Sequence, residues 1–331
     1  MRAVLMHQSG SPDVLLYSHE VEPPRIHTGH QVLVRLKAAG VNPIDTKLRS
    51  RGTYYPEQMP AILGCDGAGV VEEVGEAVTR FRTGDEVYFC QGGIGGEQGN
   101  YAELNVVDER FIAKKPRNVD FVTAAAAPLA LITAWEALHD RARIEAGQKV
   151  LVHAGAGGVG HVAIQLAKAA GCQVITTVSS KEKAEFVRQL GADETLIYPE
   201  VDVADTVTTW SGGDGVDVVL DAVGGKVFEQ SFAATRPYGH IVSLLQPAEV
   251  DWKVARLRNL SISLELMLSP IYFGWFAAQE HQAWILEQCA QLIDEAKLSV
   301  RVSHTLPLEE AANAHELLES GGMQGKVVLT I

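Results

Sequence analysis

Cysteine is scarce in this chain of 331 residues, which contains four. They lie far apart and form no C-x-x-C motif, so the sequence predicts no disulfide framework and favours a reducing, cytoplasmic location. Long apolar runs are also absent. The longest, from 124 to 135, is interrupted by Pro128 and is too short to span a bilayer, and the first ten residues lack a signal-peptide core. We therefore expect no membrane association.

Basic residues are outnumbered, with 28 Lys and Arg against 41 Asp and Glu and a formal charge of −13. Nucleic acids and anionic lipids bind basic surfaces, so we expect neither partner. The chain is 47% hydrophobic and 21% charged, as in ordinary globular proteins, and its length suggests two domains.

A glycine-rich stretch is the most informative feature that is present. The apolar run 150–152 leads into G-x-G-x-x-G spacing, and residues 161–170 have the apolar spacing of a helix. Side chains at these glycines would obstruct a tight turn, keep the backbone from a pyrophosphate or separate helix from sheet. The N–H groups at the start of the helix would then face an anion. The candidate contacts are Gly155, Ala156, Gly157, Gly158, Val159 and Gly160.

The context of this motif matters, because a lone G-x-G-x-x-G is weak evidence. About 20 residues after the first glycine, the spacing expected of a second strand in such a unit, residues 173–178 are β-branched and apolar. Strand, glycine turn, helix and strand make a βαβ unit and predict a dinucleotide-binding domain.

The remaining pattern predicts an α/β protein of two domains. Short β-like runs separated by turn residues fill the chain to about 115, and residues 124–138 read as one helix. Strands then alternate with helices, which indicates a doubly wound parallel sheet that ends in an edge strand at 260–266. We predict a catalytic domain at 1–122, a dinucleotide-binding domain at 123–267 and a return to the catalytic domain at 268–331.

Several motifs occur together along the chain. They are AAGVNPID at 38–45, LGCDGAGVV at 63–71, LITAW at 131–135, the glycine motif, DAVG at 221–224 and GKVVL at 325–329. In this combination the chain resembles the medium-chain dehydrogenase/reductase superfamily and, within it, the zinc-independent quinone oxidoreductase or ζ-crystallin-like branch. The resemblance implies a GroES-like β-rich catalytic domain plus a Rossmann doubly wound parallel sheet, with the active site in the cleft between them.

The zinc-dependent branch of the superfamily is the main competing interpretation. In zinc-dependent relatives a cysteine lies where this chain has Asn42, and a histidine lies where it has Cys65; only Asp66 keeps an acidic residue. The closely spaced cysteines of the structural zinc lobe are missing from 89–101. A catalytic zinc needs three protein ligands and an open position. We therefore predict no metal.

The cofactor expectation depends on the end of the second strand. NAD-preferring domains place a carboxylate there to bind the ribose, whereas residues 177–181 of this chain contain none. The resemblance places four residues around a 2′-phosphate and implies NADPH: Ser179, Ser180, Lys183 and Tyr198. An ordinary solvated helix start is the alternative for Lys183, and Gly321 replaces an arginine that some relatives use for the phosphate.

The reaction we expect is transfer of the NADPH hydride to a quinone or another conjugated carbonyl acceptor, a small molecule. Without zinc, acceptors whose negative charge delocalises are favoured. Asn42 is the candidate hydrogen-bond donor to the acceptor oxygen or the nicotinamide ribose, although Asn before Pro is also a good turn former. Tyr54 or Tyr55 could close the pocket and supply a proton, or could simply form a loop wall.

The other candidate cofactor contacts follow from the family positions and from the rule that strand ends line the site. They are Thr133 near the nicotinamide, Val223 and Gly224 after the fourth strand, and Ser243 and Leu244 after the fifth. For Thr133, capping or packing within its helix is the alternative.

Two other functions and one assembly stay open at this stage. An enoyl-thioester or 2-alkenoate reductase would transfer hydride in the same geometry. A non-catalytic, crystallin-like protein would bind NADPH without transferring its hydride. The edge strand at 260–266 would leave an apolar edge unpaired, a liability that a partner usually covers. We therefore expect a homodimer formed through this edge of the Rossmann sheet.

Overall fold

The computed structural model describes residues 1–247 and 249–331, and the chain divides into two compact units. The first unit contains Met1–Leu129, Leu268–Ala296 and Val300–Ile331, and the second contains Ala130–Met267 with Lys297–Ser299. The first change of unit therefore comes later than the predicted boundary between 122 and 123. The reason is that helix α2, Phe121–Ala125, packs against strands of the first unit.

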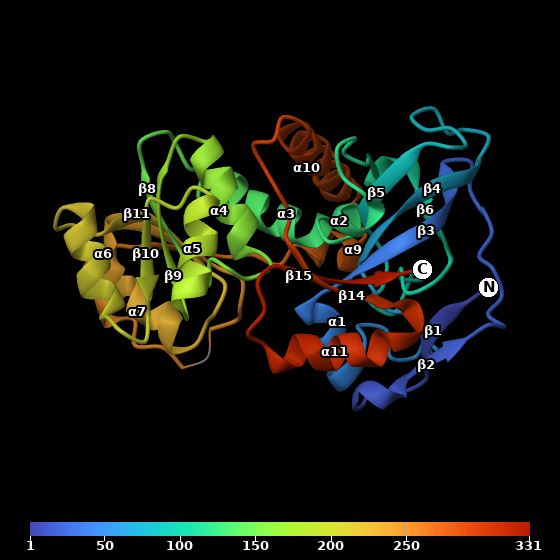
Figure 1. Ribbon diagram of the computed structural model, residues 1–331, viewed down its shortest axis with the longest axis horizontal. Helices are drawn as coiled ribbons and strands as arrows, with labels where there is room; N and C mark the ends of the chain where they lie inside the picture. Colours follow the sequence, from blue (N-terminus) through green and yellow to red (C-terminus); the bar gives the residue numbers. More distant parts are fainter. Residues whose placement is uncertain (248) are drawn as a thin grey trace. The chain divides into compact units, whose positions relative to one another are not determined.

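The first unit is built on β-strands, most of them antiparallel (Figure 1). A seven-stranded sheet has the order β14-β15-β3-β4-β5-β7, with β6 paired to β3, and a separate hairpin joins β1 to β2. The strands are β1 (Ala3–Met6), β2 (Leu15–Ser18), β3 (Gln31–Val41), β4 (Asp66–Val74), β5 (Glu86–Cys90), β6 (Leu104–Asp108), β7 (Ala113–Lys114), β14 (Val302–Pro307) and β15 (Lys326–Thr330).

Alternating side chains give this sheet its core. In β3 the buried residues Val34 and Leu36 alternate with the exposed residues Arg35 and Lys37, which is the period of two expected for a strand with one face in a core. The buried side chains join a cluster from the neighbouring strands that includes Val71, Val87, Phe89, Val107 and Ile112.

Five α-helices complete the first unit: α1 (Pro43–Arg51), α2, α9 (Ser269–Phe273), α10 (Phe276–Asp294) and α11 (Ala311–Ser320). Short 3₁₀ turns occupy Pro12–Val14, Glu109–Phe111 and Leu308–Glu310. Helix α1 was not expected, although Asn42 at the N-cap and Pro43 at the first helical position are ordinary helix-start signals.

The second unit holds a six-stranded, fully parallel sheet with the order β10-β9-β8-β11-β12-β13. The strand order reverses between β8 and β11, which is the switch point where such sheets bind ligands. The strands are β8 (Lys149–Val152), β9 (Gln173–Val178), β10 (Glu194–Ile197), β11 (Val216–Asp221), β12 (Thr235–Ser243) and β13 (Ser261–Leu264). The edge strand is thus shorter than predicted.

Helices cover this parallel sheet, and α6, α7 and α8 share a buried cluster with five of its strands (Figure 1). The helices are α3 (Pro128–Trp135), α4 (Gly160–Ala169), α5 (Lys181–Gln189), α6 (Val203–Ser211), α7 (Lys226–Ala234) and α8 (Lys253–Leu257). The single helix predicted over 124–138 is wrong: α2 ends at Ala125, α3 starts at Pro128, and a π-helical turn follows over Glu136–Arg141. Pro128 explains the break, because the residue before a proline disfavours helical geometry.

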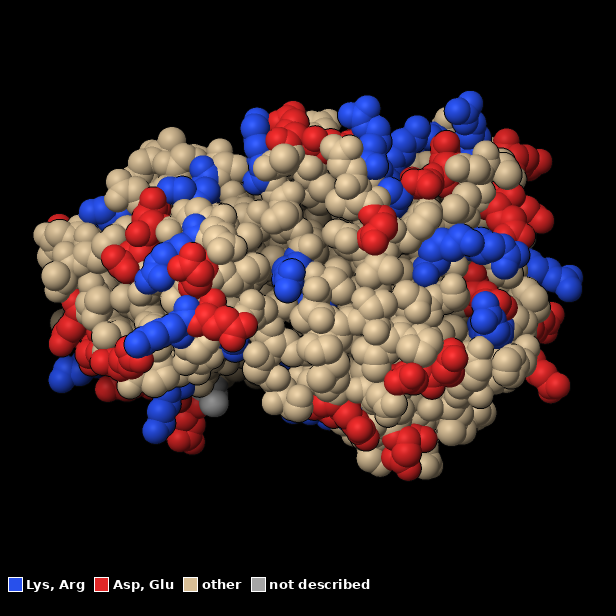
Figure 2. All heavy atoms as spheres, in the orientation of Figure 1, with Lys and Arg blue, Asp and Glu red and all other residues tan. Residues whose placement is uncertain are grey.

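No helix among the described residues is long and apolar enough to cross a membrane. Acidic and basic side chains are interspersed on the face of the molecule that Figure 2 shows.

Candidate functional site

The glycine-rich turn lies directly after β8, at the switch point of the second unit's sheet. A Cβ on Gly155 would lie 2.0 Å from the hydroxyl of Thr176, and one on Gly160 would lie 2.3 Å from the carbonyl of Ala154. Both positions therefore exclude side chains because of close packing. Ala154 itself has φ +53°, an uncommon backbone conformation for a residue other than glycine.

Gly157 differs from the other two glycines. A Cβ there would meet one atom within 4 Å, the carbonyl oxygen of Ala154 at 3.1 Å. The space above Gly157 is therefore open, as the approach of a pyrophosphate would require. Helix α4 starts three residues later, at Gly160, and its N-cap residue Val159 offers no side-chain cap, so the start of the helix is suited to an anion.

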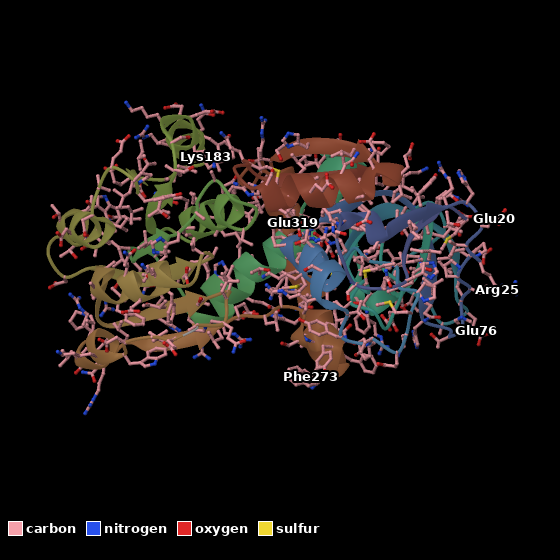
Figure 3. The ribbon with its side chains drawn as sticks, turned by 90° about the horizontal axis from the view of Figure 1, so that it is seen from below. Glu20, Arg25, Glu76, Lys183, Phe273 and Glu319 are labelled. Atoms are coloured by element: carbon pink, nitrogen blue, oxygen red, sulfur yellow. The ribbon has the colours of Figure 1, made fainter. Side chains whose placement is uncertain are left out.

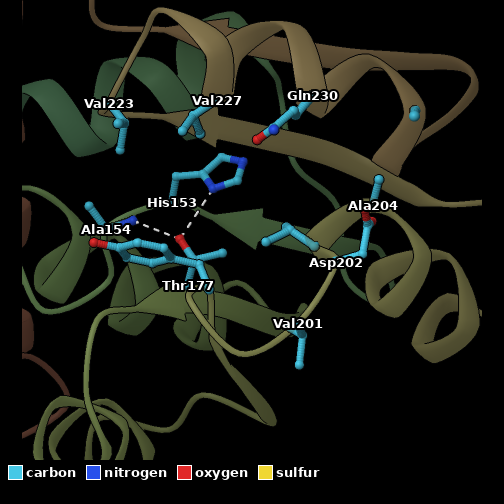
Figure 4. A pocket seen from close by; sticks show the side chains of 12 residues that line it. His153, Ala154, Thr177, Val201, Asp202, Ala204, Val223, Val227 and Gln230 are labelled. Carbon is cyan, nitrogen blue, oxygen red and sulfur yellow. Dashed lines mark hydrogen bonds between the residues drawn. The ribbon is translucent and has the colours of Figure 1, made fainter.

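A pocket of about 680 Å³ opens beside this turn, within the second unit (Figure 4). It brings together residues that follow three parallel strands: Ala154 after β8, Tyr198 after β10 and Val223 after β11. Helix α7 contributes Val227 and Gln230 to the wall. Predicted cofactor residues from distant parts of the sequence thus share one pocket.

His153 lines this pocket and was not predicted to act there. Its Nδ1 shares a hydrogen bond of 3.2 Å with the hydroxyl of Thr177 (Figure 4). Its Nε2 shares one of 3.0 Å with the hydroxyl of Ser231. The same Thr177 hydroxyl accepts a hydrogen bond from the N–H of Ala154 at 3.1 Å. Burial lowers the pKa of His153 to about 4, so the ring is neutral at pH 7 and holds the turn in place.

Asp221 organises the loops at the ends of β11 and β12. Its Oδ1 accepts hydrogen bonds of 2.9 Å from the N–H groups of Val223 and Gly224, and its Oδ2 accepts one of 2.8 Å from Ser243. Leu244 donates its N–H to the carbonyl of Asp221 at 2.9 Å. Three predicted contacts are therefore tied to the buried Asp221 carboxylate and a fourth to its backbone carbonyl; the sequence analysis quoted Asp221 in a motif but gave it no role.

The residues predicted for a 2′-phosphate lie around the start of α5 and the end of β10. Lys183 Nζ donates to the Ser179 hydroxyl at 3.1 Å, and Ser180 caps α5 by accepting from the Lys183 N–H at 3.3 Å. Figure 3 labels Lys183 at the surface, and Tyr198 is exposed as well. Ser179 and Lys183 thus form one polar group, whereas the Ser180 hydroxyl already serves as a helix cap.

Asn42 lies in the first unit, at the N-cap of α1, and is fully buried. Its Nδ2 donates to Asp66 Oδ2 at 2.9 Å, and its Oδ1 accepts from Lys326 Nζ. Lys326 Nζ also lies 3.7 Å from Asp66 Oδ2. The direct contact between Asn42 and an acceptor or ribose therefore stays a prediction; the structure shows the amide joined to two buried charged groups, of which the sequence analysis missed Lys326.

The carboxylates near Asn42 are strongly affected by burial. Asp45 Oδ2 accepts the Asn42 N–H at 2.7 Å, while Asp45 Oδ1 is buried without a hydrogen-bond partner. Burial raises the pKa of Asp45 to about 7 and also raises the pKa of Asp66, against the effect of Lys326. Asp66 Oδ1 accepts the N–H of Leu129 at 2.8 Å, so this side chain is held from several sides.

This donor set does not fit a zinc ion. A hydrogen bond with Cys90 lowers the pKa of Cys65, but burial and the nearby carboxylates together raise it to about 11, so Cys65 is a buried neutral thiol at pH 7. The ammonium of Lys326 already stands beside Asp66. Across 1–247 and 249–331, no group of three or more His, Cys, Asp and Glu side chains is placed to hold a metal ion.

The two candidate tyrosines contact the C-terminal part of the first unit. The ring of Tyr54 lies 5.1 Å from that of Tyr272, and the Tyr55 hydroxyl donates to the Tyr272 carbonyl at 3.0 Å. Tyr272 also contacts Phe273, which Figure 3 labels, with 4.7 Å between the ring centroids. Sequence reasoning missed this contact because the residues are far apart in the chain.

The last candidate, Thr133, lies on α3 of the second unit and is buried. Its predicted contact with the nicotinamide stays a prediction.

Comparison with known proteins supplies the classification. Residues 28–117 match the alcohol dehydrogenase GroES-like domain and residues 190–329 match a zinc-binding dehydrogenase family. A quinone oxidoreductase from Pseudomonas aeruginosa is 37% identical, over 97% of this chain and 96% of its own length. The chain belongs to the quinone oxidoreductase family. It is an oxidoreductase of that type, as the resemblance implied.

Two further family relatives sharpen the comparison. The structure of Escherichia coli quinone oxidoreductase complexed with NADPH matches with a TM-score of 0.87 and 30% identity, over 100% of both chains. A 2-haloacrylate reductase from a Burkholderia species is 34% identical over 99% of this chain and 98% of its own length. The predicted fold class, a GroES-like β-rich domain plus a Rossmann sheet, is confirmed.

Proposed function

We propose that this oxidoreductase uses NADPH to reduce a quinone or another conjugated carbonyl compound, without a metal ion. The full-length similarity to quinone oxidoreductases, one of them described in complex with NADPH, carries the proposal. The open space above Gly157, at the start of α4, supports a dinucleotide in the second unit.

The residues of the second unit divide the work of holding NADPH. The turn Gly155–Gly160 would receive the pyrophosphate at the start of α4, because the N–H groups of Gly155 and Gly157 already donate to the carbonyls of Thr177 and Ala154. Ser179, Lys183 and Tyr198 would surround the 2′-phosphate, because a cation and hydroxyl groups stand where NAD-preferring domains have a carboxylate. The pocket lined by Tyr198 and Val223 would take the adenosine end. Asp221 holds the loops that carry Val223, Gly224 and Ser243.

The chemistry of the acceptor follows from what the first unit offers. NADPH supplies the hydride, and the protein supplies orientation and hydrogen bonds. A quinone or an enone spreads the new negative charge over a conjugated system, so an amide N–H can stabilise it without a Lewis acid. Asn42 is our candidate for that donor, and Tyr54 and Tyr55 are candidates for the wall of the acceptor site and for proton transfer.

The direct test follows the hydride itself. NADPH carrying deuterium at the transferred position is mixed with a simple quinone in one reaction and with a simple enone in another. We expect deuterium at the β-carbon of the reduced enone, and oxidation of NADPH at a matching rate with the quinone. Retention of NADPH without turnover on any acceptor would contradict the proposal and favour a non-catalytic, crystallin-like role.

A second candidate function has one specific observation in its favour, the similarity to a 2-haloacrylate reductase. A 2-alkenoate or an enoyl thioester would accept hydride at the β-carbon in the same geometry. Rates compared across quinones, 2-haloacrylates and acyl-CoA substrates of increasing chain length would separate the two. A dependence on acyl chain length would favour the thioester, and turnover confined to carboxylates would favour the 2-alkenoate.

We also propose a homodimer formed through β13. This strand is the edge of the six-stranded sheet, and Leu264 and the nearby Leu266 are 56% and 54% exposed. An apolar edge of this kind is usually covered by a partner, and pairing of two such edges gives a two-fold dimer. Sedimentation at micromolar concentration should show a dimer that Leu264→Lys weakens. A monomeric parent protein would contradict this assembly.

We also propose that the protein is cytoplasmic and binds neither nucleic acid nor membranes. The four cysteines are free and buried, as is usual for proteins of the reducing cytoplasm. The net charge of −13 disfavours nucleic acid. The small-molecule acceptor is therefore the partner that we propose. Cell fractionation should find the protein in the cytoplasmic fraction.

A further inference from the structure

The buried triad of Asn42, Asp66 and Lys326 joins parts of the first unit that are far apart in sequence. Asn42 follows β3, Asp66 begins β4 and Lys326 begins β15, and β3 is hydrogen-bonded to both of the other strands. Asn42 and Asp66 are fully buried and Lys326 is 4% exposed. Two charges and an amide thus meet where packing alone would favour apolar side chains.

The two charged groups determine which way the amide faces. An ammonium can only donate and an ionised carboxylate can only accept. Lys326 Nζ must therefore face Asn42 Oδ1, and Asp66 Oδ2 must face Asn42 Nδ2, as the contacts show. Asp66 is fixed in turn by the Leu129 N–H at 2.8 Å. The amide has one orientation that satisfies both neighbours.

We propose that Lys326 is a positioning residue for hydride transfer and acts through Asn42. This inference rests on the proposed function of Asn42 as the donor to the acceptor oxygen. Nδ2 has two N–H groups and Asp66 accepts one, so the second, which is buried like the rest of the side chain, has no hydrogen bond to Asp66 or Lys326. The ammonium on Oδ1 withdraws electron density from the amide, and such polarisation strengthens the remaining N–H as a donor. Lys326 thereby provides a buried positive charge next to the reaction without touching the substrate.

The chain offers a matched control for this lysine. Lys115 is also buried in the first unit, where its Nζ donates to the carbonyls of Pro116 and Val119 and lies 3.1 Å from Glu86. It has no contact with Asn42 among its described bonds. Lys115→Met should therefore lower the melting temperature and leave kcat close to that of the parent protein.

The test must separate positioning from stability, because removing one member of a buried ion pair destabilises a protein whatever its role. Lys326→Met leaves Asp66 uncompensated, whereas Lys326→Met combined with Asp66→Asn removes both charges. We expect the single variant to lose melting temperature and at least tenfold in kcat, with KM for NADPH within twofold. The double variant should regain melting temperature, while kcat with a simple quinone stays at least tenfold low. Recovery of kcat together with stability would overturn the inference.

Two additional comparisons make the role specific. If Lys326 acts through Asn42, then Asn42→Ala combined with Lys326→Met should be no slower than Asn42→Ala alone, and Lys326→Arg should recover part of kcat. Independent, multiplicative losses in the combined variant would contradict the inference.

A spectroscopic readout decides the question without turnover. In protein labelled with ¹⁵N at asparagine, the side-chain amide of Asn42 is assigned by its loss in Asn42→Ala. The proton that Asp66 accepts should exchange slowly in the parent protein and faster in the double variant. Unchanged exchange would show that Lys326 does not fix the amide. A parent protein that shows this exchange pattern but reduces no acceptor would refute the proposed function and the catalytic role of the fixed amide.

Discussion

The glycine turn and the Asn42 triad differ in how their residues are distributed along the chain. The turn occupies six consecutive residues, and two of its glycines are required by contacts that are themselves local to one βαβ unit. The triad takes residues from positions 42, 66 and 326 and exists only when the sheet of the first unit is formed. A site built from neighbours is visible as a motif, whereas a site built from strand register is not.

The two sites also differ in their electrostatics. The turn relies on backbone N–H groups and a helix start, which carry partial charges and need no buried ion. The triad buries a lysine and an aspartate, with Asp45 beside them. A buried ion pair destabilises a protein unless each partner is satisfied. The stability of the triad should therefore depend on pH and on single substitutions of its members. The stability of the turn should depend on the volume of the side chains placed in it.

The largest effect should come from volume in the turn. Gly160→Val places a side chain where a Cβ alone would lie 2.3 Å from the Ala154 carbonyl, so we expect a loss of about 3 kcal/mol of unfolding free energy. Gly157→Ala meets that carbonyl at 3.1 Å and should fold normally, with NADPH affinity lowered severalfold. Urea denaturation and cofactor titration measure the two effects. Equal stability losses in both variants would contradict the assignment of Gly160 to packing and of Gly157 to cofactor binding.

The next effect should come from the pH dependence of stability at Asp45, which lies beside the triad. Because the pKa of Asp45 is about 7 in the folded protein and near 4 when unfolded, the folded state binds more protons between these values. Unfolding free energy should therefore fall as pH rises through this range. Asp45→Asn removes the titrating group, so its stability relative to the parent should rise by roughly 2–3 kcal/mol from pH 5 to pH 8. Parallel pH profiles from urea denaturation would contradict the assignment.

A smaller effect is expected at the 2′-phosphate. Lys183→Ala removes a cation from the group formed with Ser179, and a charge-assisted hydrogen bond contributes about 1.5–3 kcal/mol. NADPH should bind at least about tenfold more weakly, with NADH nearly unchanged. Lys181→Ala, an exposed lysine of the same helix start, is the control and should change neither affinity. Equal losses for both cofactors in Lys183→Ala would refute the phosphate role.

The smallest effect should appear at the aromatic contacts of the first unit. Tyr272→Ala removes the ring next to Tyr54 and Phe273, and such ring pairs contribute about 0.5–1.5 kcal/mol. We expect KM for an aromatic quinone to rise a few fold, while KM for NADPH stays the same. Steady-state kinetics with both substrates varied would check this. A change confined to KM for NADPH would exclude Tyr272 from the acceptor site.

The fold followed from sequence wherever one local pattern was sufficient. The βαβ unit around 150–178 and the run of alternating strands and helices that follows are periodic and have clear turn residues. The helix break at Pro128 was missed because apolar spacing was given more weight than the restriction that proline places on Ala127. Helix α1 was missed even though Asn42 and Pro43 carry its start signal.

The site residues could likewise be predicted only where a local pattern marks them. Asp221 could have been singled out, because a buried acid at the end of a strand often binds the backbone of the loop that follows. Lys326 and Tyr272 could not, because each depends on a contact across more than two hundred positions, with Asn42 and with Tyr55. Only the register of β15 against β3 places Lys326 beside Asn42.

The measurement that tests the central claim most directly is cofactor oxidation by metal-stripped protein, with NADPH and NADH compared on a simple quinone and a simple enone. We predict turnover with NADPH in the presence of a chelator, slower turnover with NADH, and no gain when zinc is restored. Activity that appears only with added zinc and an alcohol would contradict this account, and the site around Asn42 and Cys65 would then have to be rebuilt around a metal.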